Sequence, residues 1–196
     1  MAEPERTWMS FVDGENLTIR AQNLAAKAGV TLVEGPYYKK DCFVWMPATR
    51  GTERLWARFP LIYSFALRAS YYTSFVGDDQ ALQTIREGLW KLGFDAHAFK
   101  KARGAARAKG VDVALTKDML SHAFRGNYES AVLVAGDGDY LPLVEEVKRL
   151  GKQVHIWFFE GEGLSPDLKL SADVFFDLTN RFIDRWKNKA NEPVPP

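Results

Sequence analysis

The stretch Ala131–Tyr140 constrains the fold of this chain more than any other part of the sequence. Its first five residues are all small or branched and apolar, which is typical of a central parallel strand buried on both faces. Two glycines then alternate with two acids, Asp137 and Asp139, and residues 141–151 show apolar positions at helical spacing. The pattern predicts a buried strand, an acidic turn at its carboxyl end and a helix.

Asp137 and Asp139 allow two interpretations. In the first, Asp139 caps the following helix by accepting hydrogen bonds from its free N–H groups, and Asp137 only shapes the turn. In the second, the two carboxylates bind a hard divalent cation, because like charges this close above an apolar strand repel each other unless a cation or a proton is shared. The second interpretation requires that other acids reach the same place.

Another strand with a terminal acid lies near the start of the sequence. Trp8–Asp13 is a short apolar run that ends in an acid, a glycine provides the turn, and the spacing predicts a helix over 16–28 that is capped by Asn16. In a parallel sheet the carboxyl ends of the strands lie at one edge, where α/β folds bind their ligands. We therefore expect Asp13 to join the two acids of the later turn, because the pattern occurs at two strand ends. For a lone aspartate after a strand, the alternative role is that of a helix cap.

A third segment, Lys109–Phe124, carries a further acid at the start of a predicted helix. Asp112 is placed either to cap that helix or to point across the sheet edge toward the other acids. Asp118 follows six residues later, about 240° around the helix. The two acids share an ion only if Asp112 lies in a frayed first turn, so Asp118 is a weaker candidate ligand, with a surface role as the alternative.

A run of cations without any acid precedes this helix, and such a run is suited to holding a nucleic-acid backbone. A solvated surface is the alternative interpretation. The five cations are Lys100, Lys101, Arg103, Arg107 and Lys109. A second basic stretch, residues 34–60, mixes cations with aromatic residues and predicts either base stacking with phosphate contacts or a loop that its aromatic residues pin to the core.

The remaining pattern alternates strands with helices, which predicts an α/β fold with a parallel sheet. The further strands are expected at 67–75, 94–99, 153–159 and 172–178. The further helices are expected at 78–92, 164–170 and 180–190. In the second of these, Ser165 and Pro166 are suited to the N-cap and the first helical position.

Composition excludes several classes of protein. A single cysteine, Cys42, excludes an intramolecular disulfide and a Cys-rich zinc site, and the three histidines lie far apart in the sequence. The net charge of +1 does not define a partner. The polar, acidic first residues do not resemble a signal peptide, and no apolar run approaches the roughly 20 residues of a membrane span. We therefore expect a cytoplasmic protein without a membrane partner.

Three ordered motifs resemble those of the NYN domain, in the LabA-like branch of the PIN-like nucleases. They are Phe-Val-Asp-Gly-Glu-Asn ending at Asn16, Lys-Gly-Val-Asp-Val-Ala-Leu-Thr-Lys-Asp ending at Asp118, and Val-Ala-Gly-Asp-Gly-Asp-Tyr-Leu-Pro-Leu ending at Leu143. The resemblance spans residues 7–180 and leaves 181–196 as a basic helix and a Pro-rich tail. It implies a three-layer α/β/α sandwich with a mainly parallel central sheet and a PIN-like, Rossmann-like topology.

The resemblance also implies an activity, that of a Mg²⁺- or Mn²⁺-dependent endoribonuclease that hydrolyses RNA phosphodiester bonds. The implied catalytic and metal-binding residues are Asp13, Asp112, Asp137 and Asp139, with Asn16 supporting the first. Where the family commonly has a serine before Gly-Asp-Gly-Asp, this chain has Ala135, and its basic aromatic stretch is longer than the family needs. These departures bear on which substrate is bound more than on the cleavage reaction, because the acids of the motifs are all present.

Two other functions fit parts of the same pattern. A non-catalytic module would bind RNA or a protein through the basic aromatic surface and use a metal only structurally, but the acids present at every motif position argue against it. A haloacid-dehalogenase-like phosphatase shares the late Gly-Asp-Gly-Asp pattern, but its first motif requires Asp-x-Asp, where this chain has Asp13-Gly-Glu15. The sequence leaves the formation of a homo-oligomer open.

Overall fold

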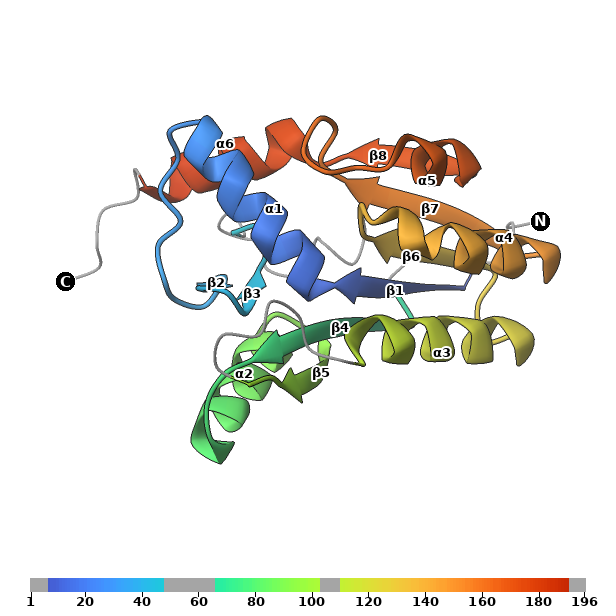
Figure 1. Cartoon of the computed structure of the whole chain (residues 1–196), viewed down its shortest axis with the longest axis horizontal. Helices are drawn as coiled ribbons and strands as arrows, with labels where there is room; N and C mark the ends of the chain where they lie inside the picture. Colours follow the sequence, from blue (N-terminus) through green and yellow to red (C-terminus); the bar gives the residue numbers. More distant parts are fainter. Residues whose placement is uncertain (1–6, 48–65, 103–109, 191–196) are drawn as a thin grey trace, which may run out of the picture.

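The structure, a computed structural model, describes residues 7–47, 66–102 and 110–190. Within these residues, six strands form one sheet and two short strands form a hairpin (Figure 1). The strands are β1 (Trp8–Asp13), β2 (Tyr38–Lys39), β3 (Phe43–Val44), β4 (Arg68–Phe75), β5 (Asp95–Lys100), β6 (Ser130–Val134), β7 (Gln153–Phe158) and β8 (Val174–Asp177). The helices are α1 (Gly14–Lys27), α2 (Asp79–Lys91), α3 (Val111–Phe124), α4 (Leu141–Arg149), α5 (Pro166–Ser171) and α6 (Thr179–Ala190).

The order of strands in the main sheet is β5-β4-β1-β6-β7-β8, and every neighbouring pair is parallel. Counted along the chain without the hairpin, this is the 3-2-1-4-5-6 order of a Rossmann-like sheet. The order reverses between β1 and β6, where Val12 lies opposite Val134. Because sheets of this kind bind ligands outside the carboxyl ends of the strands at the switch point, a site is expected at the ends of β1 and β6.

Helices cover both faces of the sheet, because successive residues of a strand point to opposite sides. In β1, Trp8 and Val12 pack on the side of α1, α2 and α6, whereas Met9 and Phe11 pack on the side of α3, α4 and α5. β6 divides in the same way, and all of its residues are buried. The structure therefore confirms the predicted α/β class, with helices on both sides of a parallel sheet.

The basic aromatic stretch predicted at 34–60 is described only as far as Pro47, and its remainder lies outside the described residues. The described part contains the hairpin, in which Tyr38 lies opposite Val44. Tyr71 of β4 holds the hairpin, because its buried hydroxyl donates to the carbonyl of Val44 and accepts from the N–H of the same residue, each at 3.1 Å. The sequence does not predict this hairpin, since each of its strands has only two residues.

Helix α6 packs into the core on the side of the sheet that α1 and α2 cover. Phe182 and Trp186 are buried on its inner face. The ring centroid of Phe182 lies 5.1 Å from that of Phe159, and the centroid of Trp186 lies 6.3 Å from that of Tyr38. Residue 180, the predicted end of the domain, lies in the first turn of this helix.

Candidate active site

Asp13 is the last residue of β1, and its carboxylate accepts two hydrogen bonds. The side chain is buried, with 3% of the residue exposed. Oδ1 accepts a hydrogen bond from the backbone N–H of Asn16 at 2.9 Å, and Oδ2 accepts one from the hydroxyl of Tyr140 at 3.0 Å. Asp13 is therefore the N-cap of α1, and the prediction that Asn16 caps this helix is wrong, because the helix begins at Gly14, two residues earlier than the spacing indicates.

Asn16 instead connects the first motif to the last one. Its Oδ1 atom accepts a hydrogen bond from the backbone N–H of Gly136 at 3.1 Å, in a buried position. Gly136 lies two residues beyond the end of β6, directly before the first acid of the turn. The amide of Asn16 therefore fixes this turn against the start of α1, which gives a physical basis to its predicted supporting role.

Two glycines allow the chain to pack closely where the acids emerge. A Cβ atom on Gly14 would lie 2.0 Å from the ring of Tyr71. A Cβ atom on Gly136 would lie 2.3 Å from the ring of Phe158 and 2.7 Å from the carbonyl oxygen of Gly163. Since such distances are far shorter than a van der Waals contact, neither position accepts a side chain unless the neighbouring groups move.

Asp137 and Asp139 differ in their surroundings. Asp137 is half-buried, and its Oδ1 accepts a hydrogen bond from the N–H of Asp139 at 3.2 Å, so that it caps a short 3-10 helix over Gly138–Tyr140. Asp139 is exposed and lies within this turn. The capping residue is thus Asp137, and the interpretation in which Asp139 is the cap is wrong.

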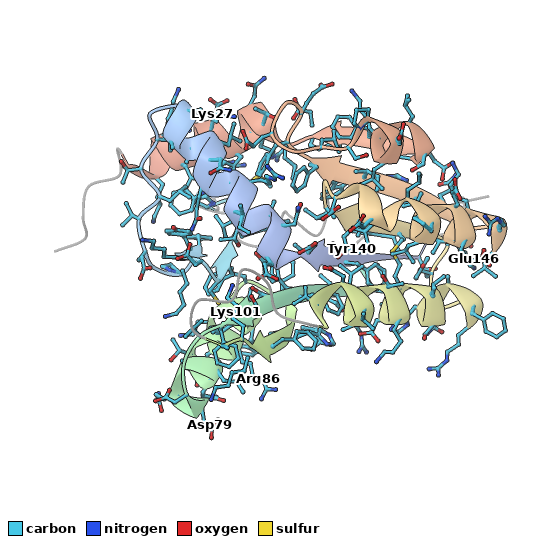
Figure 2. The ribbon with its side chains drawn as sticks, viewed as in Figure 1. Lys27, Asp79, Arg86, Lys101, Tyr140 and Glu146 are labelled. Carbon is cyan, nitrogen blue, oxygen red and sulfur yellow. The ribbon has the colours of Figure 1, made fainter. Side chains whose placement is uncertain are left out.

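Asp112 reaches the same edge of the sheet from α3. It lies in the first turn of the helix and is exposed, and its Oδ1 lies 3.1 Å from the hydroxyl oxygen of Tyr140. One buried tyrosine therefore joins the end of β1, the start of α3 and the turn after β6, and Figure 2 labels it beside the carboxyl end of β1. Sequence reasoning missed Tyr140, whose only local signal is a hydroxyl next to the two acids of its motif.

The electrostatics of this arrangement favour a shared proton or cation. The pKa of Asp13 is raised from 3.8 to about 7. Burial is the largest cause and the charge of Asp112 adds to it, whereas the hydrogen bonds from the N–H of Asn16 and the hydroxyl of Tyr140 act in the opposite direction. Burial, followed by the charges of Asp13 and Asp112, raises the pKa of Tyr140, which keeps its hydroxyl neutral. The hydroxyl of Tyr140 has a single hydrogen to donate. If both Asp13 and Asp112 are ionised, one of the two contacts between this hydroxyl and a carboxylate oxygen therefore has no hydrogen in it.

The donor atoms at this position suit a hard divalent cation. Mg²⁺ prefers carboxylate oxygens and is commonly held by one or two carboxylates together with waters and substrate phosphates. Asp13 and Asp112 supply two such groups, and no lysine or arginine of the described segments forms an ion pair with either. Among the residues that the structure describes, no group of three or more His, Cys, Asp or Glu side chains converges closely enough to hold a metal. The four-aspartate ligand set therefore stays a prediction.

Asp118, the weaker candidate, lies farther along α3 and has partners of its own. The hydroxyl of Tyr72 donates to its Oδ2 at 3.1 Å, and the ammonium of Lys117 lies 3.3 Å from its Oδ1. The ring of Tyr72 stacks on that of His97 with the centroids 4.5 Å apart. These contacts join Asp118 to the middle of β4 and β5, so a role in holding that part of the helix is the simplest account of it.

The predicted phosphate-binding cations do not form one exposed set. Lys100 is exposed, but the ammonium of Lys101 lies 3.0 Å from Oε1 of Glu15, with only 13% and 9% of the two side chains exposed. Ser74 donates to the same oxygen of Glu15 at 2.6 Å, and Figure 2 labels Lys101. Lys101 therefore neutralises a buried acid. The other three predicted cations, Arg103, Arg107 and Lys109, lie outside the described residues.

Comparison with known proteins decides the family. The model of the NYN domain matches residues 8–179, which is most of the chain. The chain belongs to the NYN domain family. This confirms the resemblance inferred from the three motifs and places the protein among nuclease-like domains of the PIN type.

Other comparisons of this NYN domain concern its fold. A crystal structure of a protein of unknown function from Vibrio parahaemolyticus is similar, with a TM-score of 0.62 and 20% sequence identity over 93% of this chain and 99% of that chain. At this identity the likeness shows the fold alone. Comparison with curated proteins gives no significant match. None of the helices in the described segments combines the length and the apolar composition that crossing a membrane requires.

Proposed function

We propose that this NYN domain is a metal-dependent ribonuclease that hydrolyses RNA phosphodiester bonds at the carboxyl edge of its sheet. One observation carries the proposal: carboxylates from β1 and α3, Asp13 and Asp112, meet at a single hydroxyl beside the strand end that bears Asp137. The site lies at the switch point of the sheet, where a Rossmann-like fold binds its ligands.

Asp13 and Asp112 would hold Mg²⁺ or Mn²⁺, and Asp137 and Asp139 would complete the site directly or through water. When bound, such an ion neutralises charge on the scissile phosphate and lowers the pKa of a coordinated water to make it a nucleophile. The chain itself keeps the two carboxylates close together and ties the acidic turn to α1 through Asn16. Because water would be the nucleophile in this mechanism, it requires no nucleophilic side chain.

The contacts of Glu15 support a nuclease over a phosphatase of the haloacid-dehalogenase kind. That class requires Asp-x-Asp in its first motif, and Glu15 occupies the position of the second acid here. Its carboxylate is engaged by Lys101 and Ser74 and is largely buried. Glu15 therefore contributes to the local structure, and its charge is balanced.

The proposal is tested by incubating purified protein with labelled single-stranded RNA, structured RNA and DNA, each with Mn²⁺, with Mg²⁺ and with chelator. We expect cleavage of RNA with the metals and none with chelator. Asp112→Asn should remove cleavage while leaving the circular dichroism spectrum unchanged, and Asp184→Asn, which changes an exposed acid on α6, should cleave like the wild type.

Three outcomes would overturn the proposal. Intact RNA in every metal condition would exclude the activity, and preferential cleavage of DNA would exclude the substrate class. Full cleavage by Asp112→Asn, with contaminating nuclease excluded by a parallel purification, would exclude the site.

A further inference from the structure

The hydroxyl of Tyr140 is the meeting point of the candidate site. It lies 3.0 Å from Oδ2 of Asp13 and 3.1 Å from Oδ1 of Asp112. The three residues come from three separate segments of the chain, namely the end of β1, the first turn of α3 and the 3-10 turn after β6. A single side chain therefore sets the position of two carboxylates relative to each other.

The ring of Tyr140 is a firm support for that hydroxyl. Only 3% of the residue is exposed, and it belongs to the core that α3 and α4 build against the sheet. Its backbone N–H donates to the carbonyl oxygen of Asp137 at 3.2 Å. The place of the hydroxyl is thus determined by the packing of the core, independently of whether the two carboxylates are ionised.

Of the two carboxylates, Asp112 depends more on this contact. Asp13 is buried and is also held through its other oxygen by the N–H of Asn16. Asp112 is exposed at the start of a helix, where an aspartate side chain has several rotamers open to it. The contact with Tyr140 restricts these rotamers and holds one oxygen at the hydroxyl that Asp13 also contacts.

We propose that Tyr140 is a positioning residue for the metal site, whose hydroxyl sets the separation and orientation of Asp13 and Asp112 before the cation binds. The inference rests on the proposed function, because it takes these two carboxylates to be ligands. Groups that hydrogen-bond to ligating carboxylates orient them, and removing such a group typically weakens metal binding by about 10- to 100-fold. Tyr140 acts through the two aspartates and makes no contact with substrate in this scheme.

The test uses Tyr140→Phe, which removes the hydroxyl and keeps the ring. The matched control is Tyr128→Phe, because Tyr128 is buried in the same core and its hydroxyl donates to a backbone carbonyl, that of Met119, at 2.9 Å. Mn²⁺ binding is measured by titration calorimetry on the full chain. We expect Tyr140→Phe to bind Mn²⁺ at least about tenfold more weakly than the wild type, and Tyr128→Phe to bind it equally well even if its melting temperature falls.

A second measurement separates positioning from general destabilisation. The Mn²⁺ titration is repeated with Asp112→Asn and with the double variant Asp112→Asn/Tyr140→Phe. If Tyr140 acts through Asp112, its loss should weaken Mn²⁺ binding much less in the variant that already lacks the Asp112 charge. In cleavage assays Tyr140→Phe should need more Mn²⁺ for half-maximal rate, with kcat at saturating Mn²⁺ changed only a few-fold.

The outcomes distinguish the two proposals. Mn²⁺ binding by Tyr140→Phe that equals or exceeds that of the wild type would refute the positioning role and leave the nuclease proposal intact. The positioning role through Asp112 would also be refuted if Tyr140→Phe weakened Mn²⁺ binding by the same factor in the wild type and in Asp112→Asn. The proposed metal site itself would be overturned if the wild type did not bind Mn²⁺, or if Asp112→Asn bound Mn²⁺ as tightly as the wild type.

Discussion

Asp13 should make the stability of the metal-free protein fall as the pH rises toward neutrality. Burial, with the charge of Asp112 as a second contribution, raises the pKa of this carboxyl from 3.8 to about 7 in the folded protein. Between these values the folded state holds a proton that the unfolded state releases. The stability linked to this proton is fully present below about pH 3.8 and is lost as the pH rises through about 7.

The size of the effect follows from the same pKa difference. A tenfold change in proton affinity corresponds to about 1.4 kcal/mol, so the difference between 3.8 and about 7 corresponds to at most about 4 kcal/mol. This is a large fraction of the roughly 5–15 kcal/mol by which a domain is stable. With a urea dependence of about 2 kcal/mol per molar, the midpoint of urea unfolding should fall by up to about 2 M.

The assay is urea unfolding in chelator at pH values from 5 to 8.5, on the wild type and on Asp13→Asn. The asparagine keeps the shape of the side chain and an oxygen for the N–H of Asn16 but cannot ionise. We expect Asp13→Asn to be more stable than the wild type above pH 7 and to lack most of the pH dependence, while Asp139→Asn, which changes an exposed acid of the same site, retains it. A wild-type stability that stays level or rises from pH 6 to 8, or an Asp13→Asn variant with the wild-type slope, would refute the reasoning.

Three further predictions use the same unfolding assay. Lys101→Ala leaves Glu15 buried without its cation and should lower the free energy of unfolding by about 3 kcal/mol. The double variant Glu15→Gln/Lys101→Met should restore most of this loss, and a Lys101→Ala variant as stable as the wild type would contradict the prediction. Gly136→Ala should cost about 1–3 kcal/mol, because the added carbon would meet the ring of Phe158 at 2.3 Å, and an unchanged urea midpoint would show that the turn shifts freely. Mn²⁺ at a hundredfold its Kd should add about 2.7 kcal/mol to the wild type and clearly less to Asp112→Asn; an equal gain in both would place the ion elsewhere.

The order of strands and helices is largely readable from the sequence. The apolar runs of β1 and β6 predict buried parallel strands, because a central strand is covered on both faces. Ser165 and Pro166 predict the start of α5 correctly, since Ser165 accepts from the N–H of Leu168 as the N-cap and Pro166 occupies the first helical position. These signals are local in sequence. Local signals are sufficient to predict a strand or a helix start where intrinsic propensity and the burial pattern favour the same structure.

The helix caps at the site show where local signals are insufficient. Asparagine is a favourable cap, and Asn16 precedes an apolar helical pattern, so the spacing favours it. In the structure Asp13 accepts the capping hydrogen bond, which releases the side chain of Asn16 for a contact with Gly136 that is 120 positions away. The choice between two adequate caps is thus made by tertiary structure.

The joining of the acids at one hydroxyl could not be predicted from spacing. Tyr140 lies 127 positions from Asp13 and 28 from Asp112, and Lys101 lies 86 positions from Glu15. Such pairs depend on which strands are neighbours and in which register, and the sequence pattern alone specifies neither. The expectation that acids gather at the carboxyl ends of parallel strands nevertheless names Asp13. Asp112, at the start of a helix, is expected near it only as one of two alternatives, the other being a helix cap.

The central place of β1 in the sheet has a consequence for how the protein is made. β1 pairs with β4 on one side and with β6 on the other, so the ribosome synthesises it before either neighbour. At about 5–20 residues per second, the 120 positions between Asn16 and Gly136 take on the order of ten seconds to translate. During this interval an apolar strand has an unpaired edge, which is the kind of surface that aggregates and that chaperones bind. The yield of folded protein in a cell should therefore respond more strongly to growth temperature and chaperone supply than the equilibrium stability of the finished domain would suggest.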